Sequence, residues 1–158
     1  MIMKYKRLTK EQFESLHQEF ASFLAVLEID KAEWDMIKVH QVEKVDDLLA
    51  QFSDLVWEDV LNRARYLEHH SPDSINLFCC EKEFMDRLVV RVENPEIDLL
   101  TQEGFDWFIN HSNDASIQYF KGKKSYQSNR NTEIFKLIEE GSILTDGQLY
   151  EAVSKIIN

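Results

Sequence analysis

Residues 66–80 read YLEHHSPDSINLFCC, so two histidines and two cysteines lie close together in the chain. Imidazole and thiolate groups are the ligands that zinc prefers, usually in four-coordinate sites. The common zinc pairs are spaced as CxxC or HxxxH, whereas here both pairs consist of adjacent residues. The stretch could therefore form a metal site. Whether its histidines and cysteines can meet depends on the secondary structure of these residues.

Strand alternation argues against a zinc site built from this stretch. Neighbouring residues of a strand point to opposite faces, so His69 and His70 diverge, and so do Cys79 and Cys80. A hairpin that turns at the Pro-Asp dipeptide places His69 opposite Asn76. The nearest histidine and cysteine are then about 10 Å apart along the strands, at ~3.3 Å per residue. We therefore predict no metal ligands within one chain, and a site formed by the histidines of two chains is the alternative.

The same residues have simpler roles in a hairpin. Cys79 shares a strand face with Ile75 and Leu77 and is predicted to be a small core residue, because free cysteines are commonly buried. Cys80 is a small residue of the opposite face. The two histidines are predicted at the hairpin tip, half exposed, where they could contact a partner.

Other chemical signatures are missing from the sequence. It contains no GxxxxGK[ST], GxGxxG, HExxH or GxSxG motif and no EF-hand loop. The four glycines, at positions 104, 122, 141 and 147, are too scattered to cradle a phosphate. We therefore assign no catalytic, cofactor-binding or metal-binding residues, and the sequence argues against an enzyme without excluding one.

Hydrophobic spacing and turn residues predict an α+β fold. Thr9 and Gln12 form a capping box ahead of a helix that runs to Leu27, and Asp30 begins a second helix. Three N-terminal helices, a three- to four-stranded antiparallel meander and C-terminal helices are expected in a single domain, residues 1–158. The elements expected after Asp30 are a helix to about Ala64, strands at residues 66–71, 74–80 and 87–93, a helix capped by Thr101, an edge strand at residues 116–120, a polar loop at residues 121–131, and helices at residues 133–140 and 146–157.

The net charge of −11 narrows the classes of partner. Long-range repulsion opposes binding to nucleic acid or to an anionic membrane surface. The sequence has no apolar run typical of a secretory signal or a membrane span. A vicinal cysteine pair is not the framework of a secreted disulfide protein. These features predict a cytoplasmic protein without cofactors.

The charge is concentrated in the predicted second and third helices. Residues 28–60 hold ten acidic side chains against three lysines. The simplest explanation of this acidic cluster is a helix face exposed to solvent. The more specific hypothesis is a docking face for a basic protein partner. Candidate partner-binding residues are Glu43, Asp46, Asp47, Asp54, Glu58 and Asp59, with His69 and His70 at the hairpin tip.

The sequence therefore favours a non-enzymatic binding or adaptor protein that docks on a larger, basic partner through an acidic helical face. The first alternative is a small enzyme or ligand-binding domain with a pocket between sheet and helices, using groups such as His111 or Tyr119. The second alternative is a metal-binding protein.

Four stretches carry a family resemblance: MKYKRLTKEQFE at residues 3–14, FSDLVWEDVL at 52–61, DSINLF at 73–78 and DGQLYEA at 146–152. With these stretches the chain resembles an uncharacterised family of short, acidic bacterial cytoplasmic proteins. The stretches extend over nearly the whole chain, and none is a chemical motif. The resemblance implies one full-length domain, no activity and no functional residues.

Overall fold

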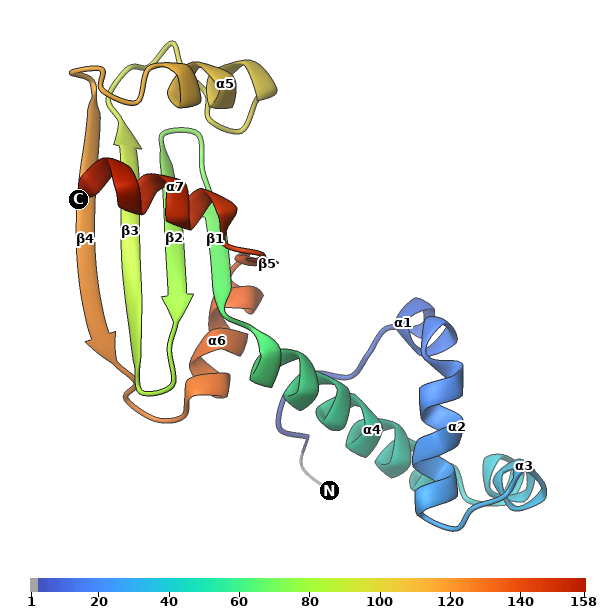
Figure 1. Ribbon diagram of the computed structural model, residues 1–158. Coiled ribbons are helices and arrows are strands. Elements are labelled where there is room, and N and C mark those ends of the chain that lie inside the picture. Colours follow the sequence, from blue (N-terminus) through green and yellow to red (C-terminus); the bar gives the residue numbers. More distant parts are fainter. Residues whose placement is uncertain (1–2) are drawn as a thin grey trace. The chain divides into compact units, whose positions relative to one another are not determined.

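The computed structural model describes residues 3–158 and divides into two compact units. The first, the helical unit, ends at Asn62, and the second, the sheet unit, spans Arg63–Asn158. Seven helices and a five-stranded antiparallel sheet make the described chain an α+β protein, as predicted (Figure 1). That the two units form one domain stays a prediction.

The helical unit contains four helices, one more than predicted. The expected first helix is interrupted at Leu16, which ends one helix and begins the next with φ −110° and ψ 23°. The interruption allows aromatic rings of both helices to meet Phe52, with ring centroids 5.9 Å away for Phe13 and 5.1 Å away for Phe20. The four helices are α1 (Lys10–Ser15), α2 (His17–Val26), α3 (Lys31–His40) and α4 (Val42–Arg63).

Both predicted N-terminal caps of this unit are confirmed. The Thr9 hydroxyl accepts from the Gln12 amide while the Gln12 side chain accepts from the Thr9 amide, which completes the capping box. The Asp30 carboxylate accepts a 2.7 Å hydrogen bond from the Glu33 amide at the start of α3. These bonds satisfy main-chain donors that a helix N-terminus leaves without partners. The helices then bury a small core of Leu24, Ile29, Ile37 and Leu48.

The sheet unit is built on strands in the order β4-β3-β2-β1-β5. His69 pairs with Asn76 across the first hairpin, which is the predicted register. Two features differ from the prediction: β4 continues through residues 121–125, and a short β5 adds a fifth strand beside β1. The bounds are β1 (Tyr66–His70), β2 (Ser74–Cys80), β3 (Phe84–Val92), α5 (Gln102–Asn110), β4 (Ile117–Ser125), α6 (Arg130–Glu139), β5 (Ile143–Thr145) and α7 (Gln148–Ile157).

Pairing explains why β4 extends into a stretch that reads as a polar loop. Every residue from Ile117 to Ser125 has a Cα partner on β3, and Lys124 lies opposite Met85. The main chain is therefore hydrogen-bonded, while the polar side chains of this edge strand remain exposed. Lysines on an edge strand also discourage pairing with another chain.

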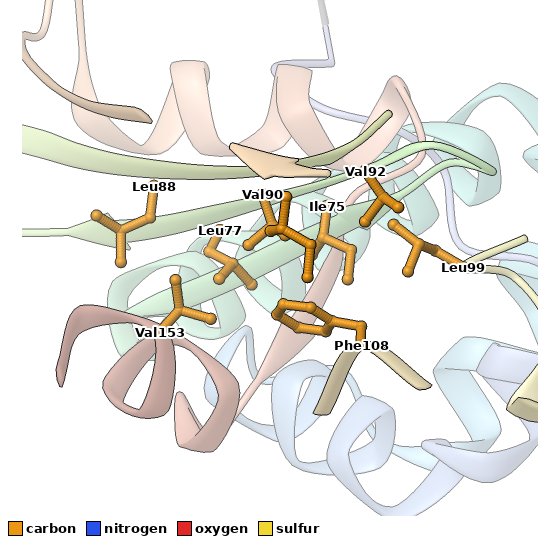
Figure 2. Close-up of a cluster of buried hydrophobic side chains, with 9 residues drawn as sticks. Ile75, Leu77, Leu88, Val90, Val92, Leu99, Phe108 and Val153 are labelled. Carbon is orange, nitrogen blue, oxygen red and sulfur yellow. The ribbon is translucent and has the colours of Figure 1, made fainter. Parts of the chain in front are cut away.

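One face of the sheet carries the larger core. In Figure 1, α7 crosses this face and α5 lies near one end of the strands. Phe108 of α5 and Val153 of α7 pack against strand residues and are at most 1% exposed. Figure 2 shows this cluster, which consists of Ile75, Leu77, Leu88, Val90, Val92, Leu99, Ile117, Phe108 and Val153. Burial of each large side chain stabilises the fold by roughly 1.5–3 kcal/mol.

The opposite face is covered in part by α6. Its Arg130 donates hydrogen bonds to the main-chain carbonyls of Ala64, Cys80 and Glu81, which ties α6 to the strand ends. Gly141 ends the helix with φ 111°, and the Ser142 amide donates to the Leu137 carbonyl as in a Schellman motif. Beyond the end of α6, the sheet surface forms a pocket.

Candidate functional site

The N-terminal segment, residues 4–8, binds part of the predicted acidic face of α4. Asp54 accepts hydrogen bonds from the main-chain amides of Lys4 (2.7 Å) and Tyr5 (2.9 Å). Glu58 pairs with the Lys4 ammonium at 3.2 Å and accepts from the Tyr5 hydroxyl. The carboxylates of Asp54 and Glu58, two of the six predicted partner-binding acids, therefore hold the chain's own basic segment.

The remaining acids of this set differ in exposure and contacts. Asp46 forms an ion pair with Arg7 at 3.3 Å, yet its side chain is 61% exposed. Glu43 lies in the first turn of α4 and is exposed, as are Asp47 and Asp59. The beginning of α4 therefore presents more negative charge to solvent than its middle does.

Three apolar side chains close in sequence to these acids are also exposed. Met36 and Val39 of α3 and Val42 of α4 are 59%, 71% and 64% exposed. Spacing of three residues places Met36 and Val39 on one side of α3. We call Met36, Val39, Val42, Glu43, Asp46 and Asp47 the α3–α4 surface. Its combination of apolar and acidic groups suits a partner with basic and apolar side chains.

His69 and His70 belong to the sheet unit and point to opposite faces of the sheet. The Nε2 atom of His70 lies 2.9 Å from Glu68 Oε1, and its ring centroid is 6.2 Å from that of Phe105. His69 is exposed and lies beside Gly141, where an added Cβ would be 3.4 Å from its Nε2 atom. The adjacent histidines thus face different surroundings, as strand alternation predicts.

Cys79 and Cys80 are both free and buried, 5% and 3% exposed. Burial raises the pKa of Cys79 to about 11, and the hydrogen bond from its thiol to Glu81 acts in the same direction. Burial also raises the pKa of Cys80 to about 12. Because the thiolate is the reactive form, both residues are protonated and unreactive at neutral pH.

We expect a disulfide reagent at pH 8 to label the native protein far more slowly than the urea-unfolded chain. Only about one Cys79 side chain in a thousand is a thiolate at that pH when its pKa is near 11. The release of chromophore with time measures the rates, and the unfolded chain is the control. Equal rates in the two states would contradict burial.

Folding raises the pKa values of both thiols, so their protonated form contributes to the free energy of unfolding. This contribution is fully present below pH ~8.5 and is lost as the pH rises through 11.

The described residues contain no group of three or more histidine, cysteine, aspartate or glutamate side chains that could hold a metal ion. Over the same residues, no helix is long and apolar enough to cross a membrane.

A pocket of about 450 Å³ lies in the sheet unit between the sheet and the end of α6. This volume is in the range of small-molecule sites, roughly 300–1,000 Å³. Its apolar lining comes from Phe78 and Met85 of the sheet and Leu137 of α6. The polar residues that line it are His69, Asn76, Arg87, Lys123, Lys124, Glu140 and Ser142.

Arg87 is the cation of this pocket with the most defined orientation. Its Nε atom donates to Asn76 Oδ1 at 3.0 Å and its Nη2 atom donates to the same oxygen. Its guanidinium carbon lies 5.7 Å from the centroid of the Phe78 ring. Arg87 forms no ion pair with any carboxylate in the part of the chain that the structure describes. Lys124, by contrast, pairs with Glu133 at 3.1 Å.

Gly122 leaves open space beside Arg87. The two residues are Cα partners on β4 and β3. A Cβ built on Gly122 would have no heavy atom within 4 Å among the residues compared. The absence of a side chain here leaves the sheet surface uncovered at the β4 position that pairs with Arg87.

A family model matches residues 3–158, and its description is a family of unknown function, DUF6495. The chain belongs to this family. The match confirms the predicted resemblance to an uncharacterised family. No curated protein and no solved structure matches the chain.

For this member of DUF6495, sequence reasoning named His69 as a candidate but missed the other residues of the pocket. His111 and Tyr119 were the expected polar groups, but His111 stacks on Trp107 with ring centroids 5.0 Å apart and Tyr119 donates to the Ser112 carbonyl. The missing information was the register between β2 and β3. It places Arg87 opposite Phe78 on the sheet face away from the main core.

Proposed function

We propose that the protein is a non-enzymatic binding protein that docks on a larger, basic protein partner through the α3–α4 surface. The observation that carries this proposal is the exposure of Met36, Val39 and Val42 next to the acidic beginning of α4. Large apolar side chains that stay exposed beside charged groups are common at protein interfaces.

The N-terminal segment supports this mode of binding. Residues 4–8 lie along α4, and Asp54, Glu58 and Asp46 bind them through both main-chain amides and basic side chains. Acidic groups of α4 therefore already hold a basic segment of the same chain. We assign the docking role to the neighbouring acids at the start of α4, which are more exposed.

The test is co-purification with a charge-reversed variant. We expect Glu43→Lys with Asp47→Lys to reduce the recovery of the partner about tenfold, since each change replaces attraction by repulsion. The matched control is Glu103→Lys with Asp106→Lys, an exposed acidic pair on α5 that also begins in the first turn of its helix. The amount of partner retained by each variant is measured by quantitative mass spectrometry.

Two results would contradict the proposal. One is full retention of the partner by the α4 variant, and the other is an equal loss with the α5 variant, which would reflect net charge alone. Circular dichroism of each variant checks that its helices are intact.

The pocket of the sheet unit favours small-ligand binding as a second candidate function. It has the volume of a small-molecule site, and its lining combines apolar side chains with polar and charged ones.

A further inference from the structure

Two properties of the pocket select a class of ligand. Its floor is apolar, formed by Phe78, Met85 and Leu137. Its Arg87 guanidinium is exposed and donates two hydrogen bonds to Asn76 Oδ1. Guanidinium groups recognise carboxylates and phosphates through paired N–H donors.

The charges around the pocket favour a single negative charge on the ligand. The Lys124 ammonium already pairs with Glu133, and Glu140 contributes a carboxylate to the lining. The Lys123 ammonium lies 3.8 Å from the centroid of the Phe84 ring, and Phe84 does not line the pocket. Among the described residues, Arg87 is therefore the lining cation that has neither an ion pair nor a ring contact outside the pocket, and one such charge suits a carboxylate better than a phosphate dianion.

We propose that this pocket binds a small organic carboxylate, with the carboxylate on Arg87 and an apolar body on Phe78, Met85 and Leu137. This site is separate in sequence and in chemistry from the α3–α4 surface. If the pocket binds no carboxylate, the docking proposal is unaffected. If the α3–α4 surface binds no partner, the pocket proposal is unaffected.

Titration of the ¹⁵N-labelled full chain with sodium phenylacetate tests the proposal. We expect saturable chemical-shift changes at residues of β2, β3 and the end of α6, with a dissociation constant in the millimolar range or below. The uncharged analogue 2-phenylethanol has the same ring and should bind at least about tenfold more weakly, because it lacks the charge that Arg87 recognises. Phenyl phosphate carries close to two charges at neutral pH and should also bind more weakly.

Three variants locate the binding. Arg87→Gln should weaken phenylacetate binding about tenfold or more, since it removes a charge-assisted hydrogen-bond donor. Arg91→Gln is the matched control, because Arg91 is an exposed cation on the same face of β3 but does not line the pocket. Gly122→Val should also weaken binding by filling open space in the pocket lining, without destabilising a strand.

The proposal is supported if Arg87→Gln and Gly122→Val lose binding while Arg91→Gln retains it. It is overturned if no saturable binding occurs or if 2-phenylethanol binds as tightly as phenylacetate. Equal losses for Arg87→Gln and Arg91→Gln would indicate general charge attraction and also overturn it. Tighter binding of phenyl phosphate would overturn the choice of a carboxylate, and unchanged binding to Gly122→Val would overturn the location.

Discussion

Replacement of Phe108 by alanine is expected to lower the free energy of unfolding of the sheet unit by about 3–5 kcal/mol. The Phe108 side chain is 0% exposed and packs with strand residues in the main core (Figure 2). The loss combines the transfer free energy of the ring with the cost of the cavity that remains. Urea unfolding followed by circular dichroism measures the change.

Phe120→Ala is the matched control for Phe108→Ala. Phe120 is a residue of β4 and is 49% exposed. Its replacement by alanine should cost roughly 0.5 kcal/mol or less, because little of its surface is removed from water. If both variants lost the same stability, the position of the core on the α5 and α7 side of the sheet would be wrong.

Replacement of Arg130 by alanine is expected to lower the free energy of unfolding by about 2–4 kcal/mol. The guanidinium group donates to the main-chain carbonyls of Ala64, Cys80 and Glu81 and to Asn131 Oδ1 at 2.8 Å. Without it, carbonyls at the ends of β1 and β2 lose a charged donor in a partly buried place. The same urea unfolding experiment measures the effect.

Two further variants define the cause of the Arg130 effect. Arg130→Lys keeps the charge but not the planar fork of donors, so it should recover less than half of the lost stability. Lys136→Ala removes an exposed cation from the same helix and should change stability by roughly 0.5 kcal/mol or less. Full recovery by Arg130→Lys would show that charge alone, rather than the shared hydrogen bonds, stabilises the strand ends.

Much of the fold follows from local patterns in the sequence. The capping box at Thr9 and the Pro-Asp hairpin turn were both predicted, and the structure confirms each one. These features depend on residues close together in the chain, where physical rules are strong. The hairpin register also explains why His69 and Cys79 do not meet.

The differences arise where distant residues decide the structure. The break at Leu16 accompanies the packing of two aromatic rings on Phe52, which lies more than thirty residues away in sequence. The extension of β4 depends on pairing with β3, because residues 121–125 have a polar composition that is typical of a loop. Local propensity is weaker than such tertiary contacts.

The candidate sites also depend on residues that are distant in the sequence. The pocket combines Arg87 from β3, Asn76 from β2, an open position at Gly122 of β4 and an apolar residue of α6. No short stretch contains this set, so no motif marks it. The acids of α4 were found from composition, but the contacts of Asp54 and Glu58 with residues 4–8 required the structure.

The most direct test of the docking proposal is the dissociation constant of the isolated partner for the two charge-reversed proteins. The account predicts that Glu43→Lys with Asp47→Lys raises this constant about tenfold relative to the unmodified chain. The variant with Glu103→Lys and Asp106→Lys should bind as the unmodified chain does. Equal dissociation constants for all three proteins would contradict docking through the α3–α4 surface.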